Sequence, residues 1–334
     1  LAYDPVLSHC ELIAEAWDAG GLYQVGSFPS YGRWSEWNGK FRDCARRFLR
    51  GDQGTVGEMV QRIMGSPDLY QHGERSPQSS INFITCHDGF TLLDLFSYSQ
   101  KYNLENGENN ADGANENLSW NCGVEGPTND ASIKRLRLQL RKNAIALLMM
   151  SQGIPMIYMG DECGRTQRGN NNAYCHDAEW NWFDWSLCEI EREMLEFTKK
   201  MIAFRKAHPV LRATQWLTGR DLVCSGYPDI SWHGVLPWKP DWSYHSQSLA
   251  FMLCGRHARR YGDNGDFLYA AFNSWREDLD FYLPVLPRGM KWHLFVDTSK
   301  EYPDDIIEPG QEVPLSNQKK RRVRARSCII LVGK

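Results

Sequence analysis

The sequence has neither a long apolar run nor an excess of one charge. Its longest apolar run in a helical pattern, residues 144–150, is far shorter than the about 20 residues that a membrane-spanning helix needs. Lys and Arg number 38 against 41 Asp and Glu, and the formal net charge is −3. The one basic run, residues 319–322, favours a solvated strand face over a binding patch. We therefore expect neither nucleic acid nor a membrane as a partner.

None of the ten cysteines belongs to a C-x-x-C pair, which argues against a zinc ribbon and a thioredoxin-type redox site. Free thiols in a reducing compartment are expected, which would be the cytoplasm, or the plastid stroma if the source is a plant or alga. Repeats and low-complexity tracts are also missing. The chain begins with Leu1, and its first ten residues resemble neither a secretory signal nor a transit peptide, so we expect a piece of a longer protein.

Short apolar segments alternate with helical patterns over residues 1–209. The segments expected to form strands are residues 11–14, 34–43, 81–86 and 153–159. The first of them is short and apolar, as is typical of a strand that is buried on both faces of a parallel sheet. The alternation of strands and helices predicts an α/β fold.

Three segments carry helical signals. The helix after the second strand is expected to place Arg46, Arg47 and Arg50 on its polar side and to stop at Gly51. Residues 132–151 have apolar side chains at helical spacing, as do residues 190–204. A capping-box pattern, from Ser186 to Glu189, is expected to start the last of these helices.

After Pro209 the helical periodicity disappears, and short strands separated by Gly, Pro and Asp take its place. The clearest strands are residues 248–254, 267–272, 292–296 and 328–332. We expect a first domain over residues 1–209 and an all-β, antiparallel sandwich domain over residues 210–334.

Carboxylates follow two of the expected parallel strands. Glu15 comes directly after the first strand, and Asp88, with His87 before it, follows the third. Because the carboxyl ends of parallel strands converge, the two acids are expected at one face, where such a pair can cleave a glycosidic bond. One acid needs a raised pKa in order to protonate the leaving oxygen. The residues alone leave a second interpretation open, in which Asp88 caps the next helix.

The stretches around these acids carry a resemblance. Residues 13–17 (IAEAW), 83–88 (FITCHD) and 153–162 (GIPMIYMGDE) resemble three ordered motifs of the α-amylase superfamily of retaining glycoside hydrolases. Other stretches resemble its isoamylase and glycogen-debranching branch: residues 18–26, 106–123, 169–176, 230–234 and 240–243. Each motif alone is weak, but their common order along the chain is specific.

The resemblance implies the C-terminal half of a (β/α)8 TIM barrel, strands 5 to 8, followed by an antiparallel β-sandwich. It also implies cleavage of α-1,6-glucosidic branch linkages, with glycogen, amylopectin or limit dextrin as the branched α-glucan partner. Glu15 matches the general acid/base, and Asp88 matches the acid that steadies the oxocarbenium-like transition state. His87 matches a hydrogen-bonding residue of the same sugar subsite.

Aromatic and amide side chains near the acids are candidates for substrate binding. Trp17 and Tyr23, close to Glu15, are expected to form subsite walls, because sugar rings stack on aromatic faces. Asn171 and Asn172 lie in the loop after the last expected strand and are expected to shape the substrate site, although a simple Asx-turn cluster fits equally well.

No cofactor and no metal is required by the sequence. Residues 108–119 partly imitate a calcium loop, with Gly113 at the turn position. The closing position holds Ser119 rather than Glu, so we expect an active-site loop instead.

One departure from the family qualifies these expectations. The family's nucleophile is an aspartate in an Arg-x-Asp stretch on the strand before the Glu15 strand, and no such stretch precedes Glu11. We therefore expect the C-terminal portion of a debranching enzyme, inactive alone, with open sheet edges that favour aggregation. Alternatives are a non-catalytic isoamylase-like glucan-binding subunit, a glucan-binding sandwich alone, and a transferase on the same fold. The oligomeric state is not predicted.

Overall fold

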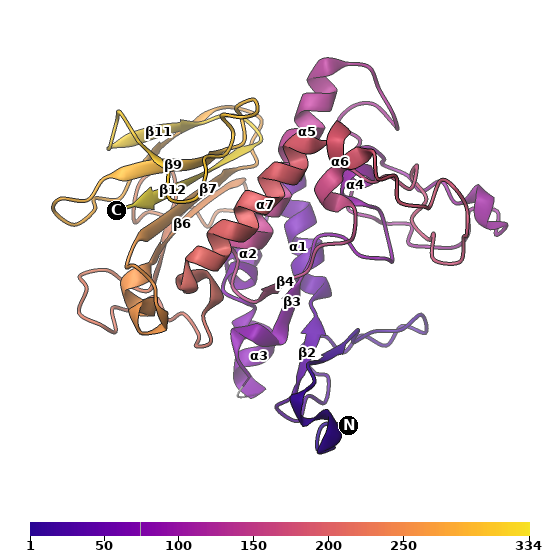
Figure 1. The fold of residues 1–334 in the computed structure, drawn as a ribbon, viewed down its shortest axis with the longest axis horizontal. Helices are drawn as coiled ribbons and strands as arrows, with labels where there is room; N and C mark the ends of the chain where they lie inside the picture. The colour runs from indigo at the N-terminus through magenta and orange to yellow at the C-terminus, as the bar shows by residue number, and fades with distance from the viewer. Residues whose placement is uncertain (74) are drawn as a thin grey trace.

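The computed structural model describes residues 1–73 and 75–334. A parallel α/β part contains the N-terminus, and an antiparallel β part contains the C-terminus (Figure 1). The two longest helices, α5 (Ala131–Met150) and α7 (Arg192–Ala207), run between the two parts. The predicted combination of an α/β fold with antiparallel β structure is confirmed.

The parallel sheet has four short strands in the order in which they occur along the chain. They are β1 (Leu12–Ala14), β2 (Trp34–Trp37), β3 (Ser80–Asn82) and β4 (Ile154–Pro155). All neighbouring pairs are parallel. The second strand is shorter than predicted, because the side chain of Asn38 accepts a hydrogen bond from the main-chain N–H of Phe41 and so begins a helix there.

The expectation that the first strand is buried on both faces is wrong. Ile13 is 48% exposed, although its neighbour Ala14 is buried. β1 is an edge of the sheet and pairs only with β2 among the described residues, so one side of it stays uncovered. At the opposite edge, Ile154 of β4 is exposed as well.

The helix after β2, α1 (Gly39–Arg50), ends at Gly51 as predicted, and this glycine has a φ of 84°. The predicted polar side is wrong for Arg46, which is buried. Its guanidinium donates to the main-chain oxygens of Ile84 and Asn117, at 2.8 and 3.0 Å, and therefore joins the helix to two loops.

The predicted helix over residues 132–151 is confirmed as α5, whereas the last helical segment is divided. A short helix, α6 (Leu187–Ile190), precedes α7, and Ile190 is exposed rather than on an apolar face. The capping-box prediction is wrong, because the Ser186 side chain makes no cap hydrogen bond to α6. The remaining helices are α2 (Val56–Ile63), α3 (Pro67–Tyr70), α4 (Leu92–Leu95) and the 3-10 turns η1 (Val6–His9), η2 (Gln71–Gly73), η3 (Pro77–Ser79), η4 (Leu104–Asn106), η5 (Asp161–Cys163), η6 (Pro209–Arg212) and η7 (Gly255–Tyr261).

The C-terminal part consists of a six-stranded and a two-stranded antiparallel sheet. The larger has the order β10-β9-β12-β7-β6-β5, and the smaller pairs β11 with β8. Their strands are β5 (Ile230–His233), β6 (Ser248–Cys254), β7 (Phe267–Asn273), β8 (Leu279–Tyr282), β9 (Trp292–Asp297), β10 (Val313–Pro314), β11 (Lys320–Val323) and β12 (Ser327–Gly333). All four strands predicted in this region are confirmed, as β6, β7, β9 and β12.

Each face of the six-stranded sheet is covered. On one face, Tyr269 and Trp292 pack with Phe281 of the two-stranded sheet. On the other face, the sheet shares one apolar core with the helices, in which the ring of Phe204 on α7 stacks on Phe295 of β9 at 3.9 Å. This common core holds the parallel and antiparallel parts against each other.

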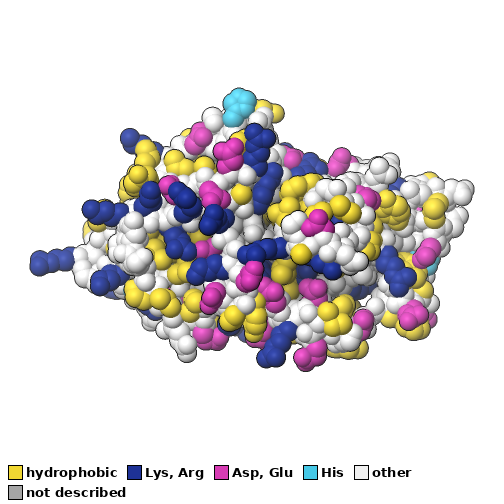
Figure 2. Space-filling model, turned by 90° about the horizontal axis from the view of Figure 1, so that it is seen from above, with side chains coloured by type: hydrophobic (Ala, Val, Ile, Leu, Met, Phe, Trp, Pro, Cys, Tyr) yellow, Lys and Arg dark blue, Asp and Glu magenta, His cyan; other side chains and the backbone are white. Residues whose placement is uncertain are grey.

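The basic run at residues 319–322 lies on β11 and is paired with acids. Lys320 and Arg322 both contact Asp280 at 3.0 Å, and Arg321 contacts Asp297 at 2.6 Å. Figure 2 shows the same mixture on a wider scale, with basic and acidic side chains interspersed over one face of the molecule. These pairs agree with a solvated strand face. Among the described helices, none has the length and apolar character of a membrane span.

Candidate functional site

Aromatic side chains from three parallel strands meet where the strands end. Trp17 follows β1, Trp37 ends β2, and Phe83 and His87 follow β3. The Trp17 ring lies 6.4 Å from the rings of both Trp37 and Phe83. The imidazole of His87 lies 5.7 Å from Trp37. The carboxyl ends of the strands therefore converge, as the sequence predicted.

A tight hairpin after β1 positions Trp17 and Tyr23. The two residues pair across the hairpin with their rings stacked at 6.1 Å. The side chain of Asp18 closes the turn by accepting from the main-chain N–H of Leu22 at 3.0 Å. A Cβ at Gly39 would lie 2.7 Å from the hydroxyl of Tyr23, so only glycine lets this ring approach α1 so closely.

A cavity of about 280 Å³ opens beside this hairpin. It is lined by Trp17, Tyr23, Arg42, Arg46, Asp88, Gly89, Glu116 and Asn117, among others. The structure thus brings three predicted site residues, Trp17, Tyr23 and Asp88, to one cavity. Glu15 lies exposed between β1 and the hairpin and does not line it, and His87 lies exposed beside Asp88.

Two arginines of α1 form part of the cavity wall. The guanidinium of Arg42 lies 5.8 Å from the ring centres of both Trp17 and Phe83. Arg46 lines the wall beside it, and burial lowers the pKa of Arg46 to about 10, with the nearby charge of Arg42 acting in the same direction. One of its nitrogens, Nη2, has no hydrogen-bond partner in the described part of the chain. Sequence reasoning missed both, although their spacing of four residues places them on one side of a helix.

Two buried carboxylates behind the cavity tie the loops after β3 and β4 together. Asp161 accepts from the main-chain N–H of Leu92 at 2.7 Å and from the hydroxyl of Thr85. Asp94 accepts from the main-chain N–H of Gln167 at 2.7 Å. Burial raises the pKa of Asp161 to about 7 and that of Asp94 to about 6, although their hydrogen bonds act in the opposite direction. The sequence assigned neither residue a role.

Asn171 and Asn172 lie in a network of side chains rather than in the cavity wall. Asn171 is buried, and its side chain bonds to the side chains of Asn103 and Asn117, both at 2.8 Å. Asn172 donates to Asp112 at 2.7 Å. The network fastens residues 103–117 to the loop after β4. Both asparagines therefore lie behind the loop that forms one side of the cavity.

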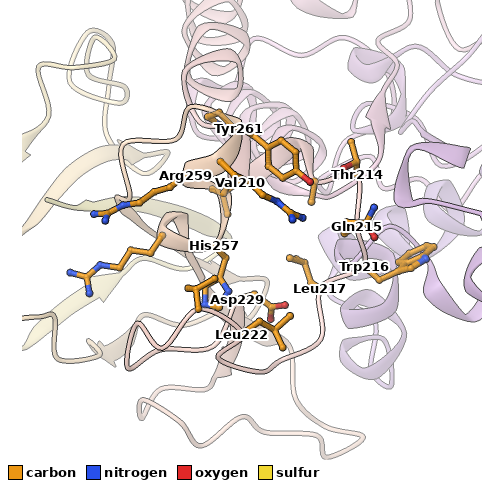
Figure 3. A pocket seen from close by; sticks show the side chains of 16 residues that line it. Val210, Thr214, Gln215, Trp216, Leu217, Leu222, Asp229, His257, Arg259 and Tyr261 are labelled. Carbon is orange, nitrogen blue, oxygen red and sulfur yellow. The ribbon is translucent and has the colours of Figure 1, made fainter.

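A second cavity, of about 410 Å³, lies between the segment that precedes β5 and the η7 turn (Figure 3). The carboxylate of Asp229 and the imidazole of His257 in this cavity already have hydrogen-bond partners within the chain. Asp229 accepts from the main-chain N–H groups of Thr218 and Gly219 at 2.7 and 2.8 Å. The Nε2 atom of His257 lies 2.9 Å from the main-chain oxygen of Tyr227. This cavity is larger, but it contains none of the predicted site residues, and the strand-end cavity remains the candidate active site.

Potential metal ligands do not cluster in the part of the chain that the structure describes, and the cysteines form no disulfide there. Over residues 1–73 and 75–334, no three His, Cys, Asp or Glu side chains converge as metal ligands. All ten cysteines are free, and six of them are buried. The lining of the strand-end cavity offers carboxylates, arginines and aromatic rings.

Comparison with known proteins supports the resemblance that the motifs suggested. Residues 231–329 match the family described as "Isoamylase 1-3, C-terminal". Isoamylase SU1, chloroplastic, from Zea mays is 46% identical over 93% of this chain and 37% of its own length. The glycogen operon protein GlgX homolog from Mycobacterium tuberculosis is 45% identical over 89% of this chain and 42% of its own length.

A pullulanase from Bacillus acidopullulyticus has a similar fold, with a TM-score of 0.67 and 21% identity, over 96% of this chain and 34% of its own. The chain spans only 37 to 42% of the length of the curated relatives described above. Over that span, the sequence matches confirm the resemblance: the chain is similar to isoamylases and to a GlgX homolog, and residues 231–329 match the isoamylase C-terminal family.

Proposed function

We propose that this chain carries two of the catalytic carboxylates of an α-1,6-glucosidase, an isoamylase-type enzyme that removes branches from glycogen or starch with retention. One observation carries the proposal: Asp88, Trp17 and Tyr23 line a single cavity at the ends of β1 and β3. An acid beside two stacked aromatic rings suits a sugar ring, because the rings bind its apolar face and the acid binds its hydroxyls. The names of the relatives, isoamylases among them, agree with this chemistry.

In this proposal Glu15 protonates the leaving oxygen and then activates water as a base. Its exposed position next to the hairpin lets it reach a substrate that lies over Trp17. Asp88 binds the hydroxyls of the sugar and stabilises the positive charge of the transition state, and His87 holds the same sugar. Arg46 is a positioning residue, because its bond to the main-chain oxygen of Ile84 fixes the segment that leads to Asp88.

A retaining mechanism also needs a nucleophile that forms the covalent intermediate. The family's Arg-x-Asp stretch has no match before Glu11, so in this proposal the nucleophile lies outside the printed sequence. We place the boundary between the catalytic domain and the β-sandwich domain at residues 209 and 210. We also infer that residues 1–334 alone do not hydrolyse branched glucan.

The proposed partner is a branched α-glucan such as glycogen, amylopectin or limit dextrin. Pullulanases of similar fold have been solved in complex with maltotriose and with maltohexaose, which supports an α-glucan as ligand. The proposed location is the cytoplasm or a plastid, and the plant relatives are described as chloroplastic.

The test uses the complete natural polypeptide and the release of reducing ends from amylopectin. Glu15→Gln is expected to lower turnover by about 10²- to 10⁴-fold, the usual contribution of a general acid/base, while glucan binding persists. Glu11→Gln is the matched control, because Glu11 is an exposed acid just before β1 and has no proposed role. A near-wild-type rate for Glu15→Gln would rule out the acid/base role.

The same assay separates the proposal from its main alternative. A complete polypeptide that binds amylopectin but never hydrolyses it would support the non-catalytic glucan-binding subunit instead. Measurable turnover by residues 1–334 alone would refute the inference that the nucleophile lies elsewhere.

A further inference from the structure

Large aromatic side chains are exposed on the segment that follows the asparagine loop. Trp182 is 60% exposed, and Tyr174, earlier in the same segment, is exposed as well. Figure 1 places this segment on the side of the molecule opposite the antiparallel sheets. An exposed indole offers its apolar face to a ligand, because aromatic faces stack on the apolar face of a bound molecule.

A cavity of about 390 Å³ lies within this segment, outside the strand-end site. It is lined by Arg165, Thr166, Arg168, Glu179, Trp180, Trp182, Phe183, Asp184 and Leu187. The two cations and the two anions of this lining balance each other. A neutral ligand with many hydroxyl groups fits such a lining better than a phosphate or another anion would, because both donors and acceptors are offered without net charge.

A buried arginine in the cavity wall has unused donors. Arg165 is only 6% exposed, and its Nη2 atom donates to the main-chain and side-chain oxygens of Asn181 at 3.0 and 2.8 Å. Its guanidinium also lies 5.2 Å from the centre of the Tyr158 ring. Its Nε and Nη1 atoms have no partner in the described residues. These two atoms are buried in the wall, so the donor that a ligand in the cavity can reach is the exposed side chain of Arg168.

A smaller neighbouring cavity extends this surface toward the candidate active site. It measures about 200 Å³ and shares Arg168 and Trp180 with the first cavity. Leu104 and Glu105 line its other side, and the same loop reaches the strand-end cavity through Asn117. The smaller cavity therefore borders both the cavity at Trp182 and the loop that lines the strand-end cavity, an arrangement that suits a long ligand built from repeating units.

We propose that the cavity between Arg165 and Trp182 is a second α-glucan-binding site. The indole of Trp182 stacks on the apolar face of a glucose unit, Arg168 donates to its hydroxyl oxygens, and Glu179 accepts from its hydroxyl groups. The charge balance and the exposed lining side chains of Trp182, Arg168 and Glu179 indicate a neutral polyhydroxy chain, and the choice of an α-glucan among such chains rests on the proposed function. The site binds chains of the polymer and performs no chemistry.

The test is a calorimetric titration of the complete natural polypeptide with maltohexaose, which has no α-1,6 branch. Trp182→Ala is expected to weaken binding at least about tenfold, as the loss of a central aromatic contact usually does. Trp185→Ala is the matched control, because it removes another exposed indole of the same segment, 78% exposed, that does not line the cavity. It is expected to change the affinity by less than about twofold.

Two additions keep the result decisive. Glu179→Gln changes an exposed acceptor, so the substitution should not disturb folding, and it is expected to weaken binding several-fold. If circular dichroism shows that Trp182→Ala is misfolded, the affinity of Glu179→Gln tests the proposal in its place. The titrations are repeated in an Asp88→Asn background, so that binding at the strand-end cavity does not hide the effect.

The proposal is overturned if maltohexaose does not bind, if Trp182→Ala and Glu179→Gln leave the affinity unchanged, or if Trp185→Ala weakens it as much as they do. These outcomes are independent of the catalytic assay. Loss of hydrolysis with binding at Trp182 intact counts against the proposed function alone, and hydrolysis without this binding counts against the second site alone.

Discussion

Asp161 allows the clearest test of how the candidate site is held together. Its carboxylate is only 2% exposed and joins the segment after β3 to the segment after β4 through Leu92 and Thr85. Asp161→Asn keeps the shape of the side chain. Its amide oxygen can still accept from the N–H of Leu92, and its NH₂ group can donate to the Thr85 hydroxyl. The variant therefore removes the titration of this group and leaves the connection in place.

The size of the effect follows from the pKa of Asp161, which burial raises from 3.8 to about 7. The folded chain holds this proton more tightly than the unfolded chain does, so the stabilising contribution of the carboxyl is complete below about pH 4 and is lost as the pH rises through about 7. A difference of about 3 pKa units corresponds to a loss of at most about 4 kcal/mol. The free energy of unfolding of Asp161→Asn lacks this contribution and should not fall in the same way.

The assay is urea unfolding of the wild type and Asp161→Asn at several values between about pH 4 and about pH 8, followed by circular dichroism. The wild type is expected to lose stability relative to the variant as the pH rises, with most of the loss complete near neutral pH. Asp304→Asn, at an exposed position, is the control and should follow the wild type. If the stability difference between the wild type and Asp161→Asn were constant with pH, or grew in favour of the wild type, the reasoning would be refuted.

Two further substitutions test contacts around α1. Arg46→Met should lower the free energy of unfolding by about 2–4 kcal/mol, because two main-chain oxygens lose their buried donor. Its control is Arg47→Met, which removes a half-exposed ion pair and should lower the free energy of unfolding by less than about 1 kcal/mol in the same urea titration. Gly51→Ala should cost about 1–3 kcal/mol, because φ is 84° and the new Cβ would lie 2.7 Å from the main-chain oxygen of Ser274. Gly57→Ala, in open space on α2, should leave the melting temperature unchanged or raise it.

The elements that were predicted well are those whose pattern is long or uniformly apolar. Helix α5 extends for 20 residues, and β6, β7 and β12 are almost entirely buried, so their residue composition alone indicates their conformation. The parallel strands are two to four residues long, too short for any periodicity to define their ends. At β2, the side chain of Asn38 ends the strand, which the alternating aromatic residues did not indicate.

Helix α7 shows why a continuous local pattern can still be interrupted. The apolar spacing runs from Ile190 to Phe204 without a break, yet the helix divides at Glu191. There the carboxylate of Glu191 bonds to both terminal nitrogens of Arg141 on α5, at 3.0 Å. That arginine is 50 positions earlier in the chain. A contact between distant helices therefore coincides with a boundary that the local sequence does not contain.

The candidate site contains two groups of residues: those that line the cavity, three of which the sequence predicted, and those that hold the surrounding loops, whose contacts it did not predict. Trp17, Tyr23 and Asp88 were predicted from motifs, and they line the cavity because they lie in the segments that follow β1 and β3. The groups that hold the loops were not predicted, because their partners are remote: Asp161 and Thr85 are separated by 76 positions, and Asn171 and Asn103 by 68. No spacing rule connects residues so far apart.

The contrast between cavity residues and buried supporting residues also decides the role of Asp161. This residue belongs to one of the family motifs and follows a strand of the same parallel sheet as the two proposed catalytic acids. A third acid at the strand ends would be a natural candidate for catalysis, but a catalytic carboxylate must reach the substrate. Asp161 is buried, and one oxygen accepts from Leu92 while the other accepts from Thr85. Its oxygens are therefore committed to the two loops, and the group determines where Asp88 lies without contacting a sugar.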